Sequence, residues 1–599
     1  MKMRIVKNRC RCLMSLVCLS ILFPGVIDMA NGKDEGMSAK IIRVADYGAK
    51  PNDMADASPA IMKALAEAKK MDGKPVVVQF EPGRYQCFGG KPMPDGRTKE
   101  PSIQVDKIEN VTIDGNGATL VGRDIARLFS ISNSKNVTVR NMTVDWDPLP
   151  HTSGRIVKVI PELHAYDIAP QIPVKPVAGR IVQGILAYDP ALHRLAKNGW
   201  EIYQTQGERD AETTQLTPEG NLRIFQKKNT PLPEAGWDVV VRHQVYGYDA
   251  FVFAFCSNVL LEDVTVNAVP GMAVIGWNSR DITIRRIKVV PSEGGWMSAT
   301  ADAMHFGSCR GKITVEDSEF AGMGDDAINI HAMYGMATGK IDDHTLEAGR
   351  ARMHPYYDTV RGIWDAPDKG DIIEYGGGDE PLIPQGQLTV EEARQDNGKQ
   401  RTIIKFKEKL PAGVGENTVL TNVSTTPAVR ISRCKVHGNR ARGMLLQTRD
   451  ILVEDCTFED VSAAGIHICT DAADWWESLG TRDVTVRNCT FTRCNFGVAR
   501  REAALDIFSD LPKGRQSAAG VHRRIHLLDN IFEGNGGAAI NVGSSDDVEV
   551  RGNKIISSGS PAIIIMNSRN VNISGNSPIG DKDVDIRGSS DRATINLKN

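Results

Sequence analysis

The sequence has no excess of positive charge, few aromatic residues and, after its N-terminal segment, no long hydrophobic run. Lys and Arg total 72 against 74 Asp and Glu, so the net charge is −2, and aromatic residues make up 6% of the chain. A protein that binds nucleic acid needs a basic surface, so this balance excludes that class of partner. No segment beyond residue 30 approaches the roughly 18 apolar residues of a membrane-spanning helix, so we expect no stable membrane insertion.

Cysteine is also scarce, and its placement argues against a disulfide framework. Three of the 11 cysteines lie within the first 18 residues, and five of the others lie beside short strand patterns instead of in loop pairs: Cys256, Cys309, Cys434, Cys456 and Cys489. No Cys-x-x-Cys pair marks a zinc site. The sequence therefore predicts buried, free cysteines in a core. We expect neither a metal nor an organic cofactor.

Residues 1–30 are predicted to be a signal peptide. Basic residues precede an apolar stretch from Leu13 to about Val26, which is too short to span a bilayer comfortably, and small residues near Ala30 offer a cleavage point. We therefore expect an exported protein that is periplasmic, secreted or held at the cell surface.

The strongest pattern that is present is a repeat of about 23 residues. Each copy has a short β-branched strand, an Asp or Asn, and a second short strand, as in NVLLEDVTVNAV from Asn258 and DVTVRNCTF from Asp483. Asn530, Asn553 and Asn576 follow the same spacing, which predicts amides stacked at one turn. Such a period is typical of a solenoid with one coil per repeat. Because the pattern of leucine-rich repeats is absent, we predict an all-β fold, a right-handed parallel β-helix.

Two stretches interrupt the repeat, at about residues 155–247 and 336–422. Both carry alternating strand patterns, and structureless loops of this length are uncommon, so we predict two small inserted β-barrel-like domains. Long surface loops are the alternative. The coils then occupy residues 40–154, with an N-terminal cap, 248–335 and 423–599. Within the cap, SPAIMKALAEAKK predicts a helix that begins with Ser58 as its N-cap and covers the open end of the solenoid.

Two segments resemble polygalacturonase-like β-helix proteins. The first is IIRVADYGAKPNDMADASPAIMKAL followed by VVVQFEPGRYQCF, which looks like their N-terminal cap. The second, ADAMHFGSCRGKITVEDSEFAGMGDDAINIHA, resembles their pattern of one Asp on one coil and Gly-Asp-Asp on the next. The resemblance implies an inverting glycoside hydrolase with three catalytic aspartates, in which Asp325 is the acid while Asp302 and Asp326 activate water.

The residues support this trio independently of the resemblance. Aligning Met304 with Ile328 places Asp302 and Asp326 at the same turn of neighbouring coils, with Asp325 beside them. Three gathered carboxylates repel one another, so at least one of them should keep a proton at neutral pH. The alternative is that the aspartates cap turns or bind calcium.

Other segments narrow the resemblance. The Gly-His-Gly and Arg-Ile-Lys signatures of polygalacturonases are missing, whereas GNRARGMLLQTRD, TDAADWWESLG and VDWDPLPHTSGRIV, with the two insertions, look like family 110 glycoside hydrolases. That resemblance implies an exported bacterial exo-α-1,3-galactosidase whose partner is a glycan with terminal α-galactose, as in blood-group B determinants. Other β-helix hydrolases, polysaccharide lyases and non-catalytic glycan-binding proteins are the alternatives.

Five further residues are candidates for binding the sugar. His305 and Asn329 should project outward beside the aspartates if their neighbours point into the core. Trp475 with Glu477 could form a platform for the apolar face of galactose, or could anchor a loop. Arg442 could donate hydrogen bonds to sugar hydroxyls, or could decorate the solenoid.

Overall fold

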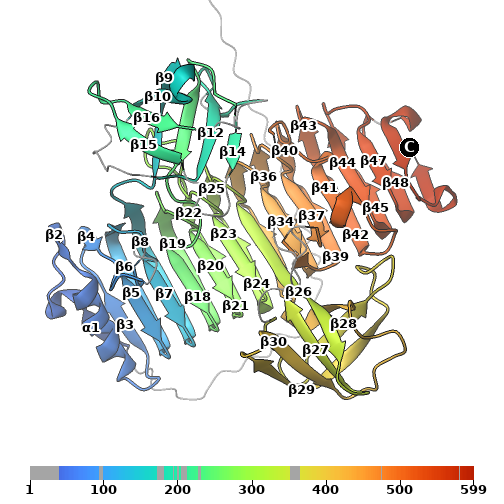
Figure 1. The fold of residues 1–599 in the computed structure, drawn as a ribbon, viewed down its shortest axis with the longest axis horizontal. Helices are drawn as coiled ribbons and strands as arrows, with labels where there is room; N and C mark the ends of the chain where they lie inside the picture. Colours follow the sequence, from blue (N-terminus) through green and yellow to red (C-terminus); the bar gives the residue numbers. More distant parts are fainter. Residues whose placement is uncertain are drawn as a thin grey trace, which may run out of the picture. The chain divides into compact units, whose positions relative to one another are not determined.

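A computed structural model describes most of the chain after residue 38 (Figure 1). The described residues are 39–93, 99–171, 181–192, 194–197, 201–203, 212–226, 231–350, 364–473, 475–498, 500–578 and 580–598. The predicted signal peptide, residues 1–30, lies outside these ranges. Ala39–Asn599 form one compact unit.

Parallel strands form three stacks, and the chain passes through each of them in turn. The first contains β6 (Glu109–Gly122), β8 (Lys135–Trp146), β19 (Ser257–Val266), β21 (Arg280–Arg285), β24 (Arg310–Glu316), β32 (Ala428–Ser432), β35 (Arg449–Glu454), β39 (Arg482–Arg487), β42 (His522–Leu528), β45 (Ser545–Arg551) and β48 (Arg569–Ser574). The second contains β22 (Lys288–Val289), β25 (Glu319–Ala321), β33 (Lys435–His437), β36 (Thr457–Glu459), β40 (Thr490–Thr492), β43 (Ile531–Glu533) and β46 (Lys554–Ile555).

The third stack contains β5 (Ile103–Asp106), β7 (Phe129–Ser132), β18 (Phe251–Ala254), β20 (Val274–Trp277), β23 (Met304–Gly307), β26 (Ile328–Lys340), β34 (Met444–Gln447), β37 (Ile466–Asp471), β41 (Ala503–Asp510), β44 (Ala538–Gly543), β47 (Ile563–Met566) and β49 (Val584–Arg587). One continuous apolar core lies inside the three stacks. The predicted parallel β-helix is confirmed.

Equivalent side chains form ladders along the coils, as the repeat predicts. The Asn530 amide donates to Asn553 Oδ1 at 3.0 Å, and the Asn553 amide donates to Asn576 Oδ1 at 2.9 Å. This stacking satisfies polar groups that are hidden from water. All eight cysteines among the described residues are free and buried, as predicted.

The predicted N-terminal helix is α1 (Ser58–Lys69), which contacts the strands at the start of the β-helix. Its buried face includes Ile61, Leu65 and Ala68. The prediction that Ser58 is the N-cap is wrong. The Asp56 carboxylate accepts from the Ser58 backbone N–H at 2.9 Å, and the Ser58 hydroxyl donates to the Phe88 carbonyl at 3.2 Å.

Two antiparallel sheets lie in the stretches that lack the 23-residue period. The described strands of the first inserted sheet do not form a closed barrel. They are β9 (His151–Ile160), β10 (Ala165–Pro170), β11 (Ile181–Val182), β12 (Gly184–Asp189), β13 (Arg194–Leu195), β14 (Glu201–Tyr203), β15 (Glu212–Leu216), β16 (Leu222–Phe225) and β17 (Asp238–Arg242). In the second, the end of β26 pairs with β27 (Thr345–Arg350) and β31 (Val419–Asn422), and β30 (Arg401–Phe406), β29 (Gly386–Asp396) and β28 (Ile372–Gly376) complete a closed barrel. Each sheet has its own apolar core.

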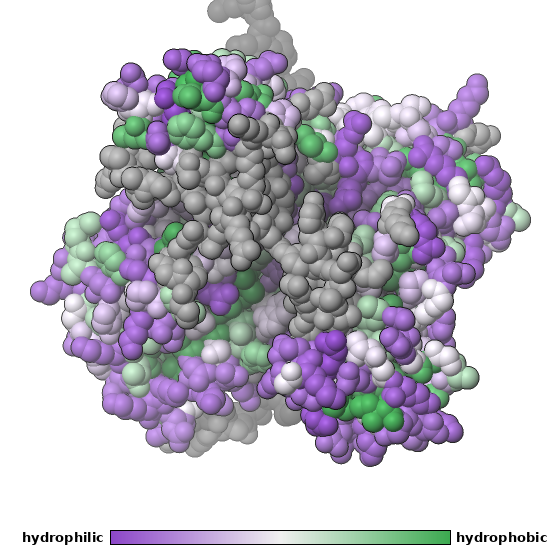
Figure 2. Space-filling view, in the orientation of Figure 1, coloured by the Kyte–Doolittle hydropathy of each residue, from purple (hydrophilic) through white to green (hydrophobic). Residues whose placement is uncertain are grey.

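The described surface is mainly polar on the face drawn in Figure 2, where hydrophobic groups form small separate patches. Among the described residues, no helix has the length and apolar character needed to cross a membrane.

Candidate active site

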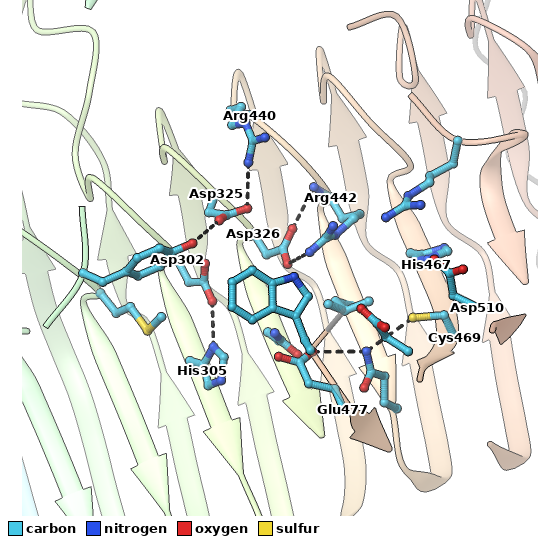
Figure 3. Close-up of a pocket in the computed structure, with 18 residues that line it drawn as sticks. Asp302, His305, Asp325, Asp326, Arg440, Arg442, His467, Cys469, Glu477 and Asp510 are labelled. Atoms are coloured by element: carbon cyan, nitrogen blue, oxygen red, sulfur yellow. Dashed lines mark hydrogen bonds and ion pairs between the residues drawn. The ribbon is translucent and has the colours of Figure 1, made fainter. Parts of the chain in front are cut away.

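A cavity of about 580 Å³ lies over the third stack, at strands β23, β26, β34 and β37 (Figure 3). Its walls are formed by Tyr246, Met272, Asp302, His305, Asp325, Asp326, Asn329, Arg440, Arg442, Leu445, Gln447, His467, Cys469, Asp471, Trp475, Glu477, Arg501 and Asp510. All eight residues that were predicted for the site from the sequence are among them.

The register of the coils explains why the acidic side chains meet here. Met304 pairs with Ile328, and Ile328 pairs with Met444, so the predicted alignment of the first two coils is confirmed. These three side chains point into the core. The residues two positions earlier, Asp302, Asp326 and Arg442, therefore occupy the same turn on three successive coils.

The three aspartates are buried, and one oxygen from each lies within 4.8 Å of the others. Burial raises the pKa of Asp302 well above its ordinary value, and the neighbouring Asp325 and Asp326 carboxylates raise it further. Burial also raises the pKa of Asp326, although Arg442 opposes this shift. The site can therefore hold a proton and an ionised carboxylate side by side, as acid–base catalysis requires.

Two of the aspartates are paired with arginines. Asp325 accepts hydrogen bonds from the Tyr246 hydroxyl at 2.7 Å and from Arg440 Nη1 at 3.1 Å. Arg440 also donates from Nε to Glu201 at 2.8 Å, so its charge is shared between two carboxylates. Asp326 accepts from Arg442 Nη2 at 2.6 Å and from the Arg442 backbone N–H at 2.9 Å.

Asp302 is paired with a histidine. His305 Nδ1 lies 2.8 Å from Asp302 Oδ2, and His305 Nε2 lies 2.7 Å from His331 Nε2. His331 Nδ1 in turn lies 2.8 Å from the Ala332 carbonyl oxygen. Burial lowers the pKa of His305. Both ring nitrogens of His305 are thus engaged by protein groups.

The remaining predicted residues lie around the trio. Trp475 is 42% exposed at the cavity wall, whereas its neighbour Trp476 is buried in a separate apolar cluster. Glu477 is held near Asn329 and 3.8 Å from His331 Nε2. Burial alone would raise the pKa of Glu477, but neighbouring groups that favour its ionised form, among them the Arg442 guanidinium and a hydrogen bond with Asn329, leave it below the ordinary value.

Sequence reasoning missed several residues of the cavity. Gln447 and His467 could have been found, because they continue the outward-facing ladders of His331 and Asn329 on β34 and β37. Tyr246 and Glu201 follow no repeat, so the 23-residue pattern held no signal for them.

Arg242, at the end of β17 in the first inserted sheet, links the turn that holds Asp302 to the turn that holds Asp325 and Asp326. It is fully buried, and its Nη1 donates to the carbonyls of Thr300 and Gly324, each at 3.0 Å. Thr300 lies two residues before Asp302, and Gly324 immediately precedes Asp325. A Cβ atom at Gly184, opposite Arg242, would lie 2.5 Å from its Nη2, so only glycine leaves room for the guanidinium.

Replacing Arg242 with methionine should lower the free energy of unfolding by about 2–6 kcal/mol, because two buried carbonyls lose their donor at about 1–3 kcal/mol each. Urea denaturation would measure this change. Arg524→Met is the matched control, because Arg524 and its partner Asp483 are 47% and 53% exposed, and such pairs are worth less than about 1 kcal/mol. Equal effects of the two substitutions would contradict the role assigned to Arg242.

Two groups of side chains in the cavity bring potential metal-ligand atoms within 4.8 Å of one another. They are His305, His331 and Glu477, and the aspartate trio. Two imidazole nitrogens bound to one tetrahedral zinc at about 2.0–2.1 Å would lie about 3.3 Å apart, so the 2.7 Å between the histidines is a hydrogen-bond distance. In the trio, Arg440 and Arg442 supply positive charge to Asp325 and Asp326.

Comparisons with known proteins agree with this architecture. Residues 417–577 match a family model described as a right handed beta helix region. The chain is 27% identical over 531 residues to alpha-1,3-galactosidase B of Bacteroides thetaiotaomicron, and the aligned region covers 83% of this chain and 82% of that protein. It is also 27% identical over 544 residues to alpha-1,3-galactosidase A of Shewanella woodyi, with 86% of each covered. The resemblance to α-1,3-galactosidases that was predicted from the sequence is confirmed.

Among solved structures, a family 28 exopolygalacturonase of Yersinia enterocolitica matches this chain with a TM-score of 0.40 and 11% identity. The match covers 89% of this chain and 78% of that one.

Proposed function

We propose that this protein is an exo-acting α-1,3-galactosidase, a glycoside hydrolase that removes terminal α-1,3-linked galactose with inversion of configuration. The observation that carries the proposal is the buried trio of Asp302, Asp325 and Asp326 at one cavity of a chain that resembles α-1,3-galactosidases over most of its length. A protein that only bound glycans would have no need for three mutually repelling carboxylates in one buried place.

In the proposed reaction Asp325 donates a proton to the departing oxygen, and Asp302 and Asp326 act on the attacking water. The water oxygen forms the new bond to galactose C1 while the glycosidic bond breaks. Arg440 donates to both Asp325 and Glu201, so it stabilises the ionised form of Asp325 less than an arginine that was paired with Asp325 alone. Arg442 opposes the rise in the pKa of Asp326 that burial causes, which favours the ionised carboxylate that can accept a proton.

We further propose that the protein is exported and that its substrates are glycans of the blood-group B type. The basic and apolar pattern of residues 1–30 supports export. Half-exposed Trp475 offers an aromatic face to a sugar ring at the cavity wall.

A direct assay tests the activity. Galactose release should be measured from branched B trisaccharide and from linear Gal-α-1,3-Gal, with α-1,4- and α-1,6-linked digalactosides as controls. Release from the α-1,3-linked compounds alone supports the proposal, whereas release from none of them, or equal release from all linkages, contradicts it.

Stereochemistry provides a separate prediction. One oxygen from each aspartate of the trio lies within 4.8 Å of the others, which is closer than the roughly 6.5–9.5 Å between the acid and base carboxyl groups of most inverting glycosidases. The configuration of the first product therefore tests the proposed mechanism directly. Proton NMR of the earliest product should show β-galactose from an α-linked substrate, because water attacks the sugar directly. Early α-galactose would instead indicate a covalent sugar–enzyme intermediate.

A further inference from the structure

A chain of three short contacts runs from the catalytic trio into the protein. It links Asp302 Oδ2 to His305 Nδ1 at 2.8 Å, His305 Nε2 to His331 Nε2 at 2.7 Å, and His331 Nδ1 to the Ala332 carbonyl at 2.8 Å. Each contact is a hydrogen bond that needs one proton between its two atoms. A carbonyl oxygen can only accept, so His331 Nδ1 carries the proton of the last bond.

Counting protons fixes the protonation of the whole chain. The three bonds need three protons, whereas an ionised aspartate and two neutral histidines carry only two. We propose that the chain holds this one additional proton, and that the proton rests on Asp302. His305 and His331 are then neutral, His305 Nε2–H donates to His331, and the bare Nδ1 of His305 accepts from the Asp302 hydroxyl.

Burial and charge favour Asp302 over either histidine as the site of this proton. Asp302 and His331 are 3% and 2% exposed, so a charged carboxylate and a charged imidazolium would both lose their hydration. With the proton on Asp302, every member of the chain is neutral. The opposite shifts of Asp302 and His305 agree, since burial raises the pKa of the carboxyl and lowers that of the imidazole.

The arginines lead to the same assignment. Asp325 is paired with Arg440, and Asp326 with Arg442, while Asp302 has a histidine in the corresponding place. Glu477 Oε1 lies 3.8 Å from His331 Nε2, beyond hydrogen-bond distance. Among the described residues, Asp302 is therefore the member of the trio that forms no ion pair with an arginine, which favours its protonated form.

This inference rests on the proposed hydrolysis and gives Asp302 and Asp326 different roles toward the attacking water. Asp302 uses Oδ2 to donate to His305, which leaves Oδ1 to accept a hydrogen bond from the water and to orient it. Asp326, which stays ionised, takes the proton as the water oxygen bonds to C1, and the departing oxygen receives the proton of Asp325. His305 and His331 are positioning residues, and neither is a sugar ligand.

Histidine nitrogen NMR tests the proton count without any activity. In protein labelled with ¹⁵N-histidine, His305 should be neutral with a protonated Nε2 and an unprotonated Nδ1, and His331 should be neutral with a protonated Nδ1. Spectra of His305→Gln and His331→Gln would assign the signals. A doubly protonated His305 or His331, or a proton on His305 Nδ1, would overturn the proposal whether or not the protein releases galactose.

Asparagine substitutions test the same idea through activity. An asparagine at 302 imitates a protonated carboxyl, because its amide can donate to His305 Nδ1 while its oxygen accepts from the water. Asp302→Asn should therefore reduce kcat/KM less than about 10-fold, whereas Asp302→Ala, which can do neither, and Asp326→Asn, which removes the base, should each reduce it by about 10²–10⁴-fold. A loss in Asp302→Asn as large as that in Asp302→Ala would contradict a protonated Asp302.

Discussion

Replacing Asp325 with asparagine is expected to lower kcat/KM for a natural α-1,3-linked disaccharide by about 10²–10⁴-fold, the usual worth of general acid assistance. An activated aryl α-galactoside should be affected far less, because its aglycone departs without a proton. Asparagine is close in size to aspartate; its oxygen can accept from Arg440 and its amide can donate to the Tyr246 hydroxyl oxygen, so the geometry of the turn is retained. The measurement is kcat/KM of the variant and of the unaltered protein on both substrates.

The control for this experiment is Tyr246→Phe, which removes the 2.7 Å hydrogen bond to Asp325 but leaves its carboxyl group. It should lower kcat/KM for both substrates to a smaller extent than Asp325→Asn lowers it for the disaccharide. Equal losses on both substrates in Asp325→Asn, with leaving-group dependence in Asp302→Asn instead, would assign the acid role to Asp302.

Asp326→Asn should lower kcat/KM for both substrates alike, also by about 10²–10⁴-fold, because water must lose a proton whatever the leaving group is. Sodium azide should restore part of the rate on the activated aryl galactoside, since azide attacks without losing a proton. With direct displacement, the product is β-galactosyl azide, which NMR identifies.

The azide experiment distinguishes the acid from the base. Asp325→Asn keeps its base, so azide should not raise its rate on the disaccharide. Rescue of Asp325→Asn in place of Asp326→Asn would mean that the acid and the base are exchanged. A rescued product with the α configuration would contradict inversion.

The part of the site that the coils build could be predicted from the sequence. Parallel strands repeat one register, so an alignment of Met304 with Ile328 was sufficient to place Asp302 beside Asp326. The same register sets Arg442 at that turn, although its contact with Asp326 was not foreseen, because the sequence does not show which way a long side chain turns. His305 does point outward as expected, but its partners are Asp302 and His331.

The part contributed by the first inserted sheet could not be predicted. Tyr246, Glu201 and Arg242 reach the aspartate turns from a segment whose antiparallel pairing has no fixed spacing relative to the coils. No periodicity joins these residues to the trio, and only the tertiary arrangement brings them together.

The Glu201–Arg440 contact has a consequence for the order in which this protein folds. Most coil contacts join residues about 23 positions apart, such as Val259 and Ile282, so coils can stack one after another along the growing chain. Glu201 and Arg440 are 239 positions apart, and ordering a loop of that length costs entropy that only the finished scaffold can offset. The cavity is thus expected to be among the last parts to form, because it is complete only after the segment that follows Gly438 has stacked on the earlier coils.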